Sequence, residues 1–528
     1  MRETLQLEAD VLVLGGGLAG TWAAVAAARS GARVILADKG YCGTSGVTAT
    51  AGPGHWWVPP DPALRSAAIE KRLATAFGLA DPAWMARIIE LTWQTLPTLA
   101  GYYDFPQDDA GVTQYRGLRG PEYMRAMRRL ALDQGVQILD QSPALELLLL
   151  ADGAVAGARG HQRQLGQDWQ VRSGAVVVAT GGCAFLSHLL GAHTNTGDGY
   201  LMAAEAGAAL SGMEFTTYYT VAPVHTSMTR SMSYAFATYY DAAGHELPIP
   251  PGPGSTDALA RALLQGTVFC SLHKMPADVR AQLPRISPNV MLPFARQGID
   301  PYTQRFEVTL RGEGTVRGIG GLDVVSDDCA TRVPGLYAAG DAATRELIAG
   351  ATSGGGAQNS AWALSSGHWA GQGAARHARS VGIRTQAAVQ GAGEAGLRPR
   401  TRAAPPPLAA VRQLVTAEML PLDKNYFRTG AGLRQSLTLL DDAWQAIRDS
   451  AGVDGADRMK WRETAALVAS GRWSYRGALA RAESRGMHHR LDHRQTDAAL
   501  AHRLVQHGVD QPQWQTPVST PQPEEQPA

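Results

Sequence analysis

Two glycine-rich motifs hold the residues whose types and spacing could do chemistry. The first is Gly15-Gly16-Gly17-Leu18-Ala19-Gly20, and the second, far along the chain, is Gly335-Leu336-Tyr337-Ala338-Ala339-Gly340-Asp341. In the first motif, Gly15 permits a tight turn, Gly17 lets the backbone approach a pyrophosphate, and Gly20 lets a helix and a strand pack closely. The spacing therefore predicts a site that binds a dinucleotide through its phosphates.

The segments around the first motif are those of a βαβ unit. Residues 10–14 are an almost continuous apolar run, which is typical of a buried parallel strand, and residues 21–30 form an alanine-rich helical segment. Residues 33–37 are a second strand, followed by Asp38, whose carboxylate can accept hydrogen bonds from ribose hydroxyls. The alternative, a glycine-rich turn without a ligand, is disfavoured by this context.

Composition excludes several classes of protein. The chain has 528 residues, too many for one hydrophobic core, and its 45% hydrophobic and 18% charged content predicts a folded globular protein. A formal net charge of +1 argues against a nucleic-acid-binding surface. The four cysteines are dispersed without a Cys-x-x-Cys motif, so we expect no metal site and no iron–sulfur cluster in this chain.

The sequence also predicts where the protein works. The first strand begins too early to leave room for a signal peptide. No uninterrupted apolar run approaches the ~18 residues that span a bilayer. We therefore expect a cytoplasmic protein with no membrane span of its own.

Dispersed motifs match, in order, those of a known superfamily. They are residues 43–52 (GTSGVTATAG), 179–182 (ATGG), 195–199 (NTGDG) with 213–215 (MEF), 340–341 (GD) and 359–360 (NS). Over about residues 8–380 the sequence resembles the flavoproteins of the succinate dehydrogenase, fumarate reductase, L-aspartate oxidase and adenylylsulfate reductase superfamily. A weaker match lies at Glu483-Ser484-Arg485-Gly486, which we interpret as docking the C-terminal helices on the flavin domain.

The resemblance implies an α/β fold: a Rossmann-like FAD-binding domain, an inserted α+β capping domain rich in aromatic residues and proline, and a C-terminal helical domain. The boundaries we expect are 1–215 and 316–384 for the discontinuous FAD-binding domain, 216–315 for the capping domain, 385–407 for a linker, 408–510 for the helical domain and 511–528 for a disordered tail.

The resemblance and the βαβ unit together predict the residues that bind FAD. They are Gly15, Gly17, Leu18, Ala19, Gly20, Asp38, Lys39, Thr44, Ser45, Gly46, Thr48, Ala51, Gly52, Ala144, Ala179, Thr180, Gly181, Asp198, Gly340, Asp341, Asn359 and Ser360. Asp341 stands where the family commonly has a glutamate. A helix that begins near Asn359 is expected to aim its N–H groups at the flavin N1/C2 edge, where they stabilise the anionic reduced form.

Two residues decide how FAD is attached. Gly46 stands where the family has the histidine that forms the covalent flavin link, so we expect non-covalent FAD. Cys42 lies nearby, and we interpret it as a small residue in a tight turn rather than as a covalent or redox thiol.

The dicarboxylate enzymes of the superfamily hold their substrate with two histidines and two arginines. The corresponding positions here are Tyr219, Thr256, Val316 and Ser353. A dicarboxylate bound without those groups would lose several kcal/mol through unpaired charge. Succinate–fumarate chemistry and aspartate oxidation are therefore not expected.

The catalytic candidates are instead Tyr219, His225, Arg317 and Arg345, with Tyr219 a possible general acid–base. For each of them the alternative is packing or an ordinary satisfied polar group. The tyrosines of the predicted capping domain favour a larger, flatter substrate than a four-carbon diacid.

Three hypotheses for the function remain. The first is an FAD-dependent oxidoreductase that moves a hydride or two electrons between flavin N5 and an organic substrate under the cap. The second is the flavoprotein subunit of an adenylylsulfate-reductase-like electron-transfer complex, with a ferredoxin-like iron–sulfur protein as partner. The third is a flavin-binding protein that has lost catalysis.

Overall fold

The computed structural model of the chain describes residues 3–228, 232–252, 254–286, 288–353, 355–450 and 456–515. All structural statements below concern these residues. The expected tail at 511–528 falls mostly outside them.

The largest sheet has eight strands in the order β14-β4-β5-β6-β1-β2-β3, with β13 also paired to β6. Its parallel strands are β1 (Leu5–Leu14), β2 (Val34–Ala37), β3 (Gln137–Leu139), β6 (Gln167–Val178) and β13 (Leu336–Ala338). Antiparallel pairing adds β4 (Ala144–Leu149), β5 (Val155–Gln162) and β14 (Gln390–Gly391). The α/β fold class predicted from the sequence is confirmed.

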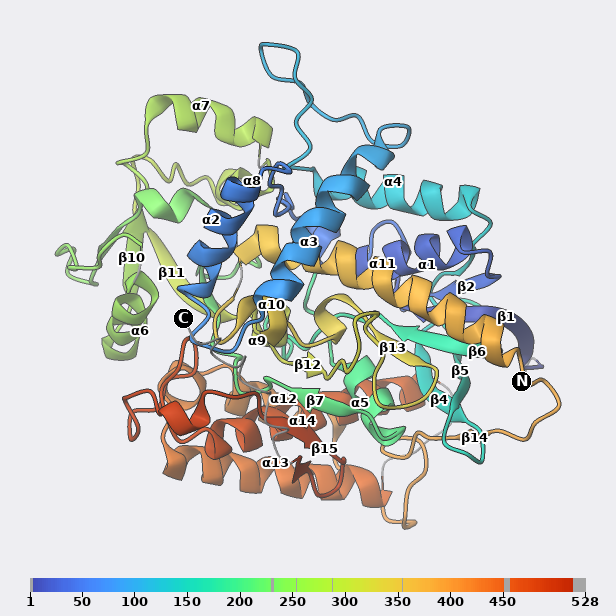
Figure 1. Cartoon of the computed structure of the whole chain (residues 1–528). Coiled ribbons are helices and arrows are strands. Elements are labelled where there is room, and N and C mark those ends of the chain that lie inside the picture. The colour runs from blue at the N-terminus through green and yellow to red at the C-terminus, as the bar shows by residue number, and fades with distance from the viewer. Residues whose placement is uncertain are drawn as a thin grey trace, which may run out of the picture.

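Two long helices lie side by side on this sheet, α1 (Leu18–Arg29) and α11 (Gly355–Val381) (Figure 1). Small residues make the approach possible, because a Cβ on Gly367 would lie 2.4 Å from the carbonyl oxygen of Ala19. A third helix, α4 (Gly120–Asp133), is tied to α1 by a 3.0 Å hydrogen bond from Trp22 Nε1 to the Tyr123 hydroxyl. The resulting core holds the N-terminus of α1 at the end of the sheet.

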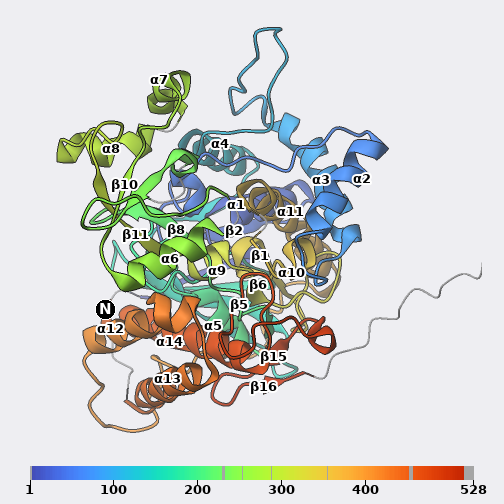
Figure 2. The same ribbon diagram turned by 90° about the vertical axis from the view of Figure 1, so that its left-hand side faces the viewer.

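A separate four-stranded antiparallel sheet stands to one side of the large sheet (Figures 1 and 2). Its order is β8 (Tyr219–Pro223), β11 (Phe306–Gly312), β10 (Val268–Ser271) and β9 (Thr238–Tyr240), with α6 (Ser255–Gln265), α7 (Ala277–Ile286) and α8 (Pro288–Gln297) around it. It has its own hydrophobic core, to which Tyr219, Tyr239 and Phe306 belong. This α+β unit occupies the segment expected to form the cap.

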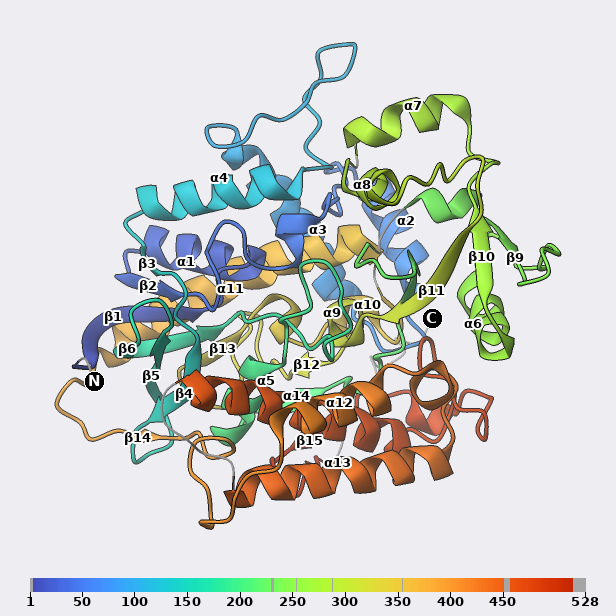
Figure 3. The ribbon, with the colours of Figure 1, turned by 180° about the vertical axis from the view of Figure 1, so that it is seen from behind.

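The C-terminal helices form a layer beneath the large sheet (Figure 3): α12 (Leu408–Met419), α13 (Gly430–Ser450) and α14 (Ala456–Ala480). The last of these helices, α14, ends at Ala480, whereas we expected the helical domain to extend to residue 510. Beyond it the chain forms turns and β15 (Val505–His507) and β16 (Gln513–Trp514), which join β7 (Ala209–Ser211) and β12 (Gly321–Leu322) in a third sheet. Gln513–Trp514 is thus a strand rather than part of a disordered tail.

The remaining elements are α2 (Pro62–Leu73), α3 (Pro82–Thr95), α5 (Asp198–Glu205), α9 (Gly314–Arg317), α10 (Glu346–Ala349) and short single turns. Helices α2 and α3 begin by the same local rule, because the side chains of Asp61 and Asp81 each accept a backbone N–H of the first turn and a proline follows. Among the described helices, none is long and apolar enough to cross a bilayer.

Candidate cofactor and substrate site

A cavity of about 1090 Å³ opens where β1, β2 and β6 end, with Leu14, Ala37 and Ala179 on its wall. This volume lies just above the ~300–1,000 Å³ range of small-molecule and cofactor sites. Every residue that the sequence predicts to contact FAD lines it, except Gly20. Gly20 lies behind the wall, where a Cβ would stand 1.8 Å from the carbonyl oxygen of Gly15, so its absent side chain serves helix packing.

The glycine turn forms one end of the cavity from backbone alone. Gly15 has φ +109°, and a Cβ there would lie 2.4 Å from the carbonyl oxygen of Ala179. Gly17 caps α1 without a side chain, and a Cβ on it would meet only Gly46 Cα, at 3.8 Å. The first N–H groups of α1 therefore face open space, which is the geometry that receives a phosphate.

Asp38 follows β2 and is buried in the same wall. A Cβ on Gly16 would lie 2.8 Å from Asp38 Oδ2, so a glycine is needed for the carboxylate to approach the turn. Burial raises the pKa of Asp38, and hydrogen bonds from Ser45 and the backbone partly oppose that rise. A hydroxyl-bearing ligand at this end would supply further donors to the carboxylate.

Lys39 and Asp198 are both predicted cofactor contacts, and the structure pairs them with each other. Lys39 Nζ lies 2.8 Å from Asp198 Oδ2 and 2.8 Å from Glu463 Oε1, and it donates to Thr196 Oγ1 at 3.0 Å. Burial opposes the charged form of Lys39, but the two carboxylates outweigh it and raise its pKa. Sequence reasoning missed Glu463, which comes from α14 and belongs to no motif.

The cavity lining also includes buried polar atoms that lack partners. Asn359, in the first turns of α11, has no hydrogen-bond partner among the described residues at either side-chain amide atom, and the same holds for the Thr180 hydroxyl. Both residues line the cavity. Leaving a buried polar group unsatisfied costs about 1–3 kcal/mol. Hydrogen bonds from these atoms to polar groups of a ligand would remove that cost.

Arg345, a catalytic candidate, does not reach the cavity. Its side chain is fully buried and donates to Asp341, to the carbonyl oxygens of Thr315 (2.8 Å) and Val316 (3.1 Å), and to that of Gly318. The residue holds Asp341 and the neighbouring loop in place from behind. We therefore correct its assignment to a positioning residue.

Tyr219 is also placed away from the cavity. Its hydroxyl donates to the Leu420 carbonyl at 2.9 Å and accepts from Asn425 Nδ2 at 3.1 Å, and burial raises its pKa. The ring packs edge-on against Tyr426 in the core beside the four-stranded sheet. A general acid–base role for Tyr219 is thus corrected to packing, because the direction of a side chain on β8 depends on a strand register that the sequence does not reveal.

The other tyrosines of that segment do not create an aromatic wall either. Tyr239 lies in the same core, and the ring of Tyr240 is covered by the guanidinium of Arg305 at 3.8 Å from its centroid. The expectation of an aromatic pocket for a flat substrate therefore loses its support.

Arg317 is the catalytic candidate that lines the cavity. Its guanidinium lies over the ring of Tyr218, 5.2 Å from the centroid, and Nε is 3.9 Å from Glu313 Oε2. His225 is exposed and lines a second, adjoining cavity. The main cavity also contains residues that no motif indicated, including Arg119, Arg163, His193, Met228 and Val290.

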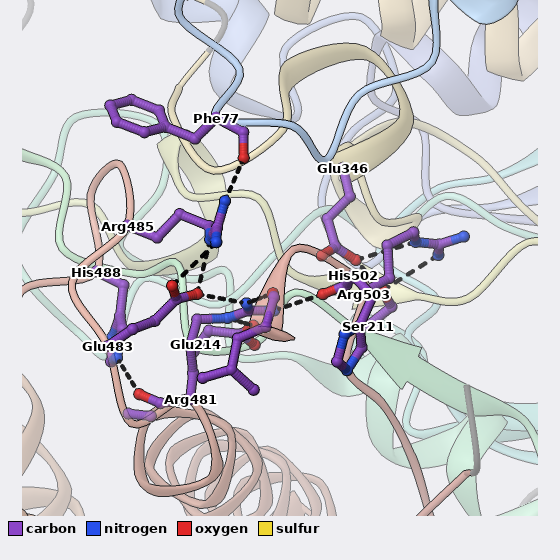
Figure 4. Close-up of polar contacts among 12 residues, drawn as sticks. Phe77, Ser211, Glu214, Glu346, Arg481, Glu483, Arg485, His488, His502 and Arg503 are labelled. Carbon is purple, nitrogen blue, oxygen red and sulfur yellow. Dashed lines mark hydrogen bonds and ion pairs between the residues drawn. The ribbon is translucent and has the colours of Figure 1, made fainter. Parts of the chain in front are cut away.

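A buried charged network ties the C-terminal segment to the rest of the protein (Figure 4). Arg481 donates to Glu214 at 2.7 Å and to Glu483 at 2.9 Å, and Arg485 donates to Glu483 at 2.7 Å and to the Phe77 carbonyl. These contacts are those expected of a docking segment at residues 483–486.

Arg503 makes a further set of polar contacts next to this network. Its guanidinium contacts Ser211 at 3.1 Å, Glu346 at 3.2 Å and Asp323 (Figure 4 shows the first two). Burial raises the pKa of Glu346 to about 7, with nearby Glu214 adding to the rise and Arg503 opposing it. Glu346 directly follows Arg345, so the network supports the loop that carries Asp341.

Comparison with known proteins gives two family matches. A family model described as FAD dependent oxidoreductase matches residues 10–288, and one described as fumarate reductase flavoprotein C-term matches residues 418–522. The first covers more than half of the chain.

Relatives and solved structures agree with these matches. The L-aspartate oxidase of Mycobacterium tuberculosis H37Rv is 29% identical over 542 residues, covering 95% of this chain and 96% of that protein. The FrdA chain of a mutant E. coli quinol fumarate reductase aligns with a TM-score of 0.81 at 21% identity, over 99% of both chains. Adenylylsulfate reductase from Archaeoglobus fulgidus aligns with a TM-score of 0.77 at 18% identity, over 97% of this chain and 96% of that one. At these identities the structural likeness establishes the fold.

Proposed function

Because the chain belongs to the FAD-dependent oxidoreductase family, we propose that it holds FAD non-covalently in the 1090 Å³ cavity and exchanges two electrons, as a hydride, with an organic substrate at the Arg317 wall. The observation that carries the proposal is the continuity of this cavity. The glycine turn, Asp38, Asp341, Asn359 and Arg317 all line this single cavity.

The residues present fit FAD. The N-terminus of α1 would receive the pyrophosphate, Asp38 the adenosine ribose, and Asp341 the ribityl hydroxyls. Asn359 would offer the flavin end buried polar atoms that have no partner in the described chain, and the Thr180 hydroxyl beside the glycine turn is likewise buried without a partner. Bound flavin would supply the two-electron chemistry, while the protein binds, orients and excludes water.

The proposal of non-covalent attachment rests on Gly46. This residue has φ +80°, and a Cβ on it would lie 3.2 Å from Gly17 Cα, so a side chain there would press on the glycine turn. Cys42 is fully buried, and burial together with Asp38 raises the pKa of its thiol to about 12. A protonated, enclosed thiol is a poor nucleophile, which argues against a link through Cys42.

A succinate-like substrate has little support here. Of the four positions where the dicarboxylate enzymes carry histidine or arginine, only Val316 is among the described residues that line the cavity. Arg317 contributes a cation to the lining of this cavity, and Met228 and Val290 contribute apolar side chains. Such a wall suits an organic molecule with an apolar body and an acidic or carbonyl group.

The test is an absorbance spectrum of the purified protein before and after acid precipitation, followed by anaerobic mixing with a panel of organic acids, alcohols and carbonyl compounds. Yellow FAD in the supernatant supports non-covalent binding, and flavin retained in the pellet contradicts it. Bleaching of the bound flavin by a reduced member of the panel, or reoxidation of reduced flavin by an oxidised one, supports oxidoreduction of an organic substrate. Folded, FAD-loaded protein that reacts with no member contradicts it.

A further inference from the structure

A second cavity, of about 610 Å³, adjoins the first. Its wall consists of His188, Leu189, Leu190, Gly191, His193, His225, Thr226, Ser227 and Arg311. Leu190, Gly191 and His193 line both cavities, so the two meet along one loop. His188 and Leu189 belong to the same loop, Arg311 comes from β11, and His225, Thr226 and Ser227 come from the segment after β8.

Arg311 is a cation without a counter-ion in this wall. Within the described part of the chain no carboxylate pairs with its guanidinium, and its Nε is buried without a hydrogen-bond partner. Burial lowers its pKa, which expresses the same cost of a desolvated charge. An anion that enters the cavity would remove this cost, and the planar guanidinium would bind its oxygens in pairs.

Three imidazoles complete the cluster. The rings of His188 and His193 stack with centroids 4.8 Å apart, and the backbone N–H of His188 donates to His193 Nδ1 at 3.2 Å. A neutral His193 then carries its proton on Nε2. His188 and His225 adopt φ +59° and +64°, a left-handed conformation that histidine rarely holds without surrounding constraint.

The charged side chains that line the second cavity indicate which kind of ligand suits it. It contains three histidines and an arginine, and no aspartate or glutamate. An arginine repels a metal cation, and the described residues include no group of three potential ligands placed to hold one. The cluster suits an oxyanion.

We infer that His188, His193, His225 and Arg311 form an oxyanion subsite that receives a carboxylate, phosphate or sulfate group of the substrate whose reacting end lies in the main cavity. The inference rests on the proposed function, and it extends that function by assigning the substrate class: an organic molecule with an acidic group held outside the flavin chamber. The two cavities adjoin at Leu190, Gly191 and His193, so the subsite lies next to the main cavity.

The probe is inorganic phosphate, titrated calorimetrically into the FAD-loaded protein at constant ionic strength maintained with chloride. We expect saturable binding that Arg311→Gln weakens about tenfold or more, since a charge-assisted contact is lost. His225→Gln, a change at an exposed loop residue, should weaken it about threefold. Arg305→Gln is the matched control, because Arg305 is exposed, precedes the same strand and stacks on Tyr240 instead.

The outcomes separate the subsite from the proposed function. No phosphate binding, or equal binding by wild type, Arg311→Gln and His225→Gln, overturns the subsite even if flavin reduction by an organic substrate is found. Phosphate that binds at Arg311 and inhibits flavin reduction competitively supports an acidic group of the substrate as the natural occupant. Binding at Arg311 without competition identifies a free inorganic anion instead and overturns the substrate assignment. Binding is measured without turnover, so a failure of the redox chemistry leaves its result intact.

Discussion

The two walls of the main cavity are built by different means. The wall at the glycine turn consists of backbone, of glycines whose Cβ would collide, and of buried charges such as Asp38 and Lys39. The opposite wall consists of side chains from distant segments, among them Arg317, His193 and Met228. A backbone wall tolerates almost no change and serves one ligand, whereas a side-chain wall can be rebuilt residue by residue.

The largest expected loss of bound FAD comes from placing a side chain in the backbone wall. Gly15→Ala puts a Cβ 2.4 Å from the Ala179 carbonyl oxygen at φ +109°, so the turn must move, at a cost on the order of 3 kcal/mol. We expect purified protein with little or no FAD, measured as the ratio of flavin absorbance to protein absorbance. Gly101→Ala, where a Cβ meets nothing within 4 Å, is the control. Normal FAD content in Gly15→Ala would refute the backbone-wall account.

The second change replaces Arg345, the buried arginine that holds the Asp341 loop in place. Arg345→Gln leaves Asp341 and the carbonyl oxygens of residues 315, 316 and 318 without their buried donor. Breaking a buried charge pair costs about 3–5 kcal/mol. Urea unfolding should show a loss of that size together with faster FAD release. A stability within ~0.5 kcal/mol of wild type, the usual range for surface substitutions, would show that the loop does not depend on Arg345.

Arg317→Gln changes a side chain that lines the cavity, whereas Arg345→Gln changes one that lies behind the lining. Because Arg317 lines the cavity, with a long 3.9 Å contact to Glu313 and its guanidinium 5.2 Å from the Tyr218 ring centroid, we expect FAD content and urea midpoint close to wild type. Flavin reduction by a substrate found in the panel should slow about 10–100-fold, as expected for loss of a charge-assisted contact. Stopped-flow absorbance measures this rate. FAD loss equal to that of Gly15→Ala would mean that the two walls are not separable.

The smallest effect is a pH dependence in the network behind both walls. The pKa of Glu346 is raised from its ordinary 4.5 to about 7, so the folded state holds a proton that the unfolded state releases at lower pH. The stabilisation is complete below the unfolded-state pKa of 4.5 and is lost as the pH rises through about 7. Wild type should lose on the order of 1–3 kcal/mol of unfolding free energy between about pH 5 and 8 from this group.

Glu346→Gln is uncharged at every pH and should flatten that part of the profile. Asp327→Asn, at a side chain that is 85% exposed, should retain the wild-type profile. Urea unfolding at several pH values compares the three proteins. A profile of Glu346→Gln parallel to wild type would place the titrating group elsewhere.

The contrast between the walls also explains what could be predicted from the sequence. The glycine turn, Asp38 and the family motifs lie in short local patterns, so the flavin family, the α/β fold and the motif-borne part of the cavity lining were predictable. Tyr219 and Arg345 were assigned wrongly to the cavity, because the direction of a side chain depends on strand register and long-range packing. Glu463 and His193 carry no local signal, and only the folded chain brings them to the cavity.

One contact of the C-terminal segment has a consequence for how the protein is made. Arg503 bonds to Ser211 and Glu346, which precede it by 292 and 157 residues. At a synthesis rate of about 5–20 residues per second, roughly 10–30 s pass between the appearance of Glu346 and that of Arg503 on the ribosome. During that interval Glu346 has Ser211 and Thr344 as partners but lacks the Arg503 guanidinium, so the glycine turn is complete long before this buried network is. Chaperone engagement should concentrate in this window and end as the last strands are released.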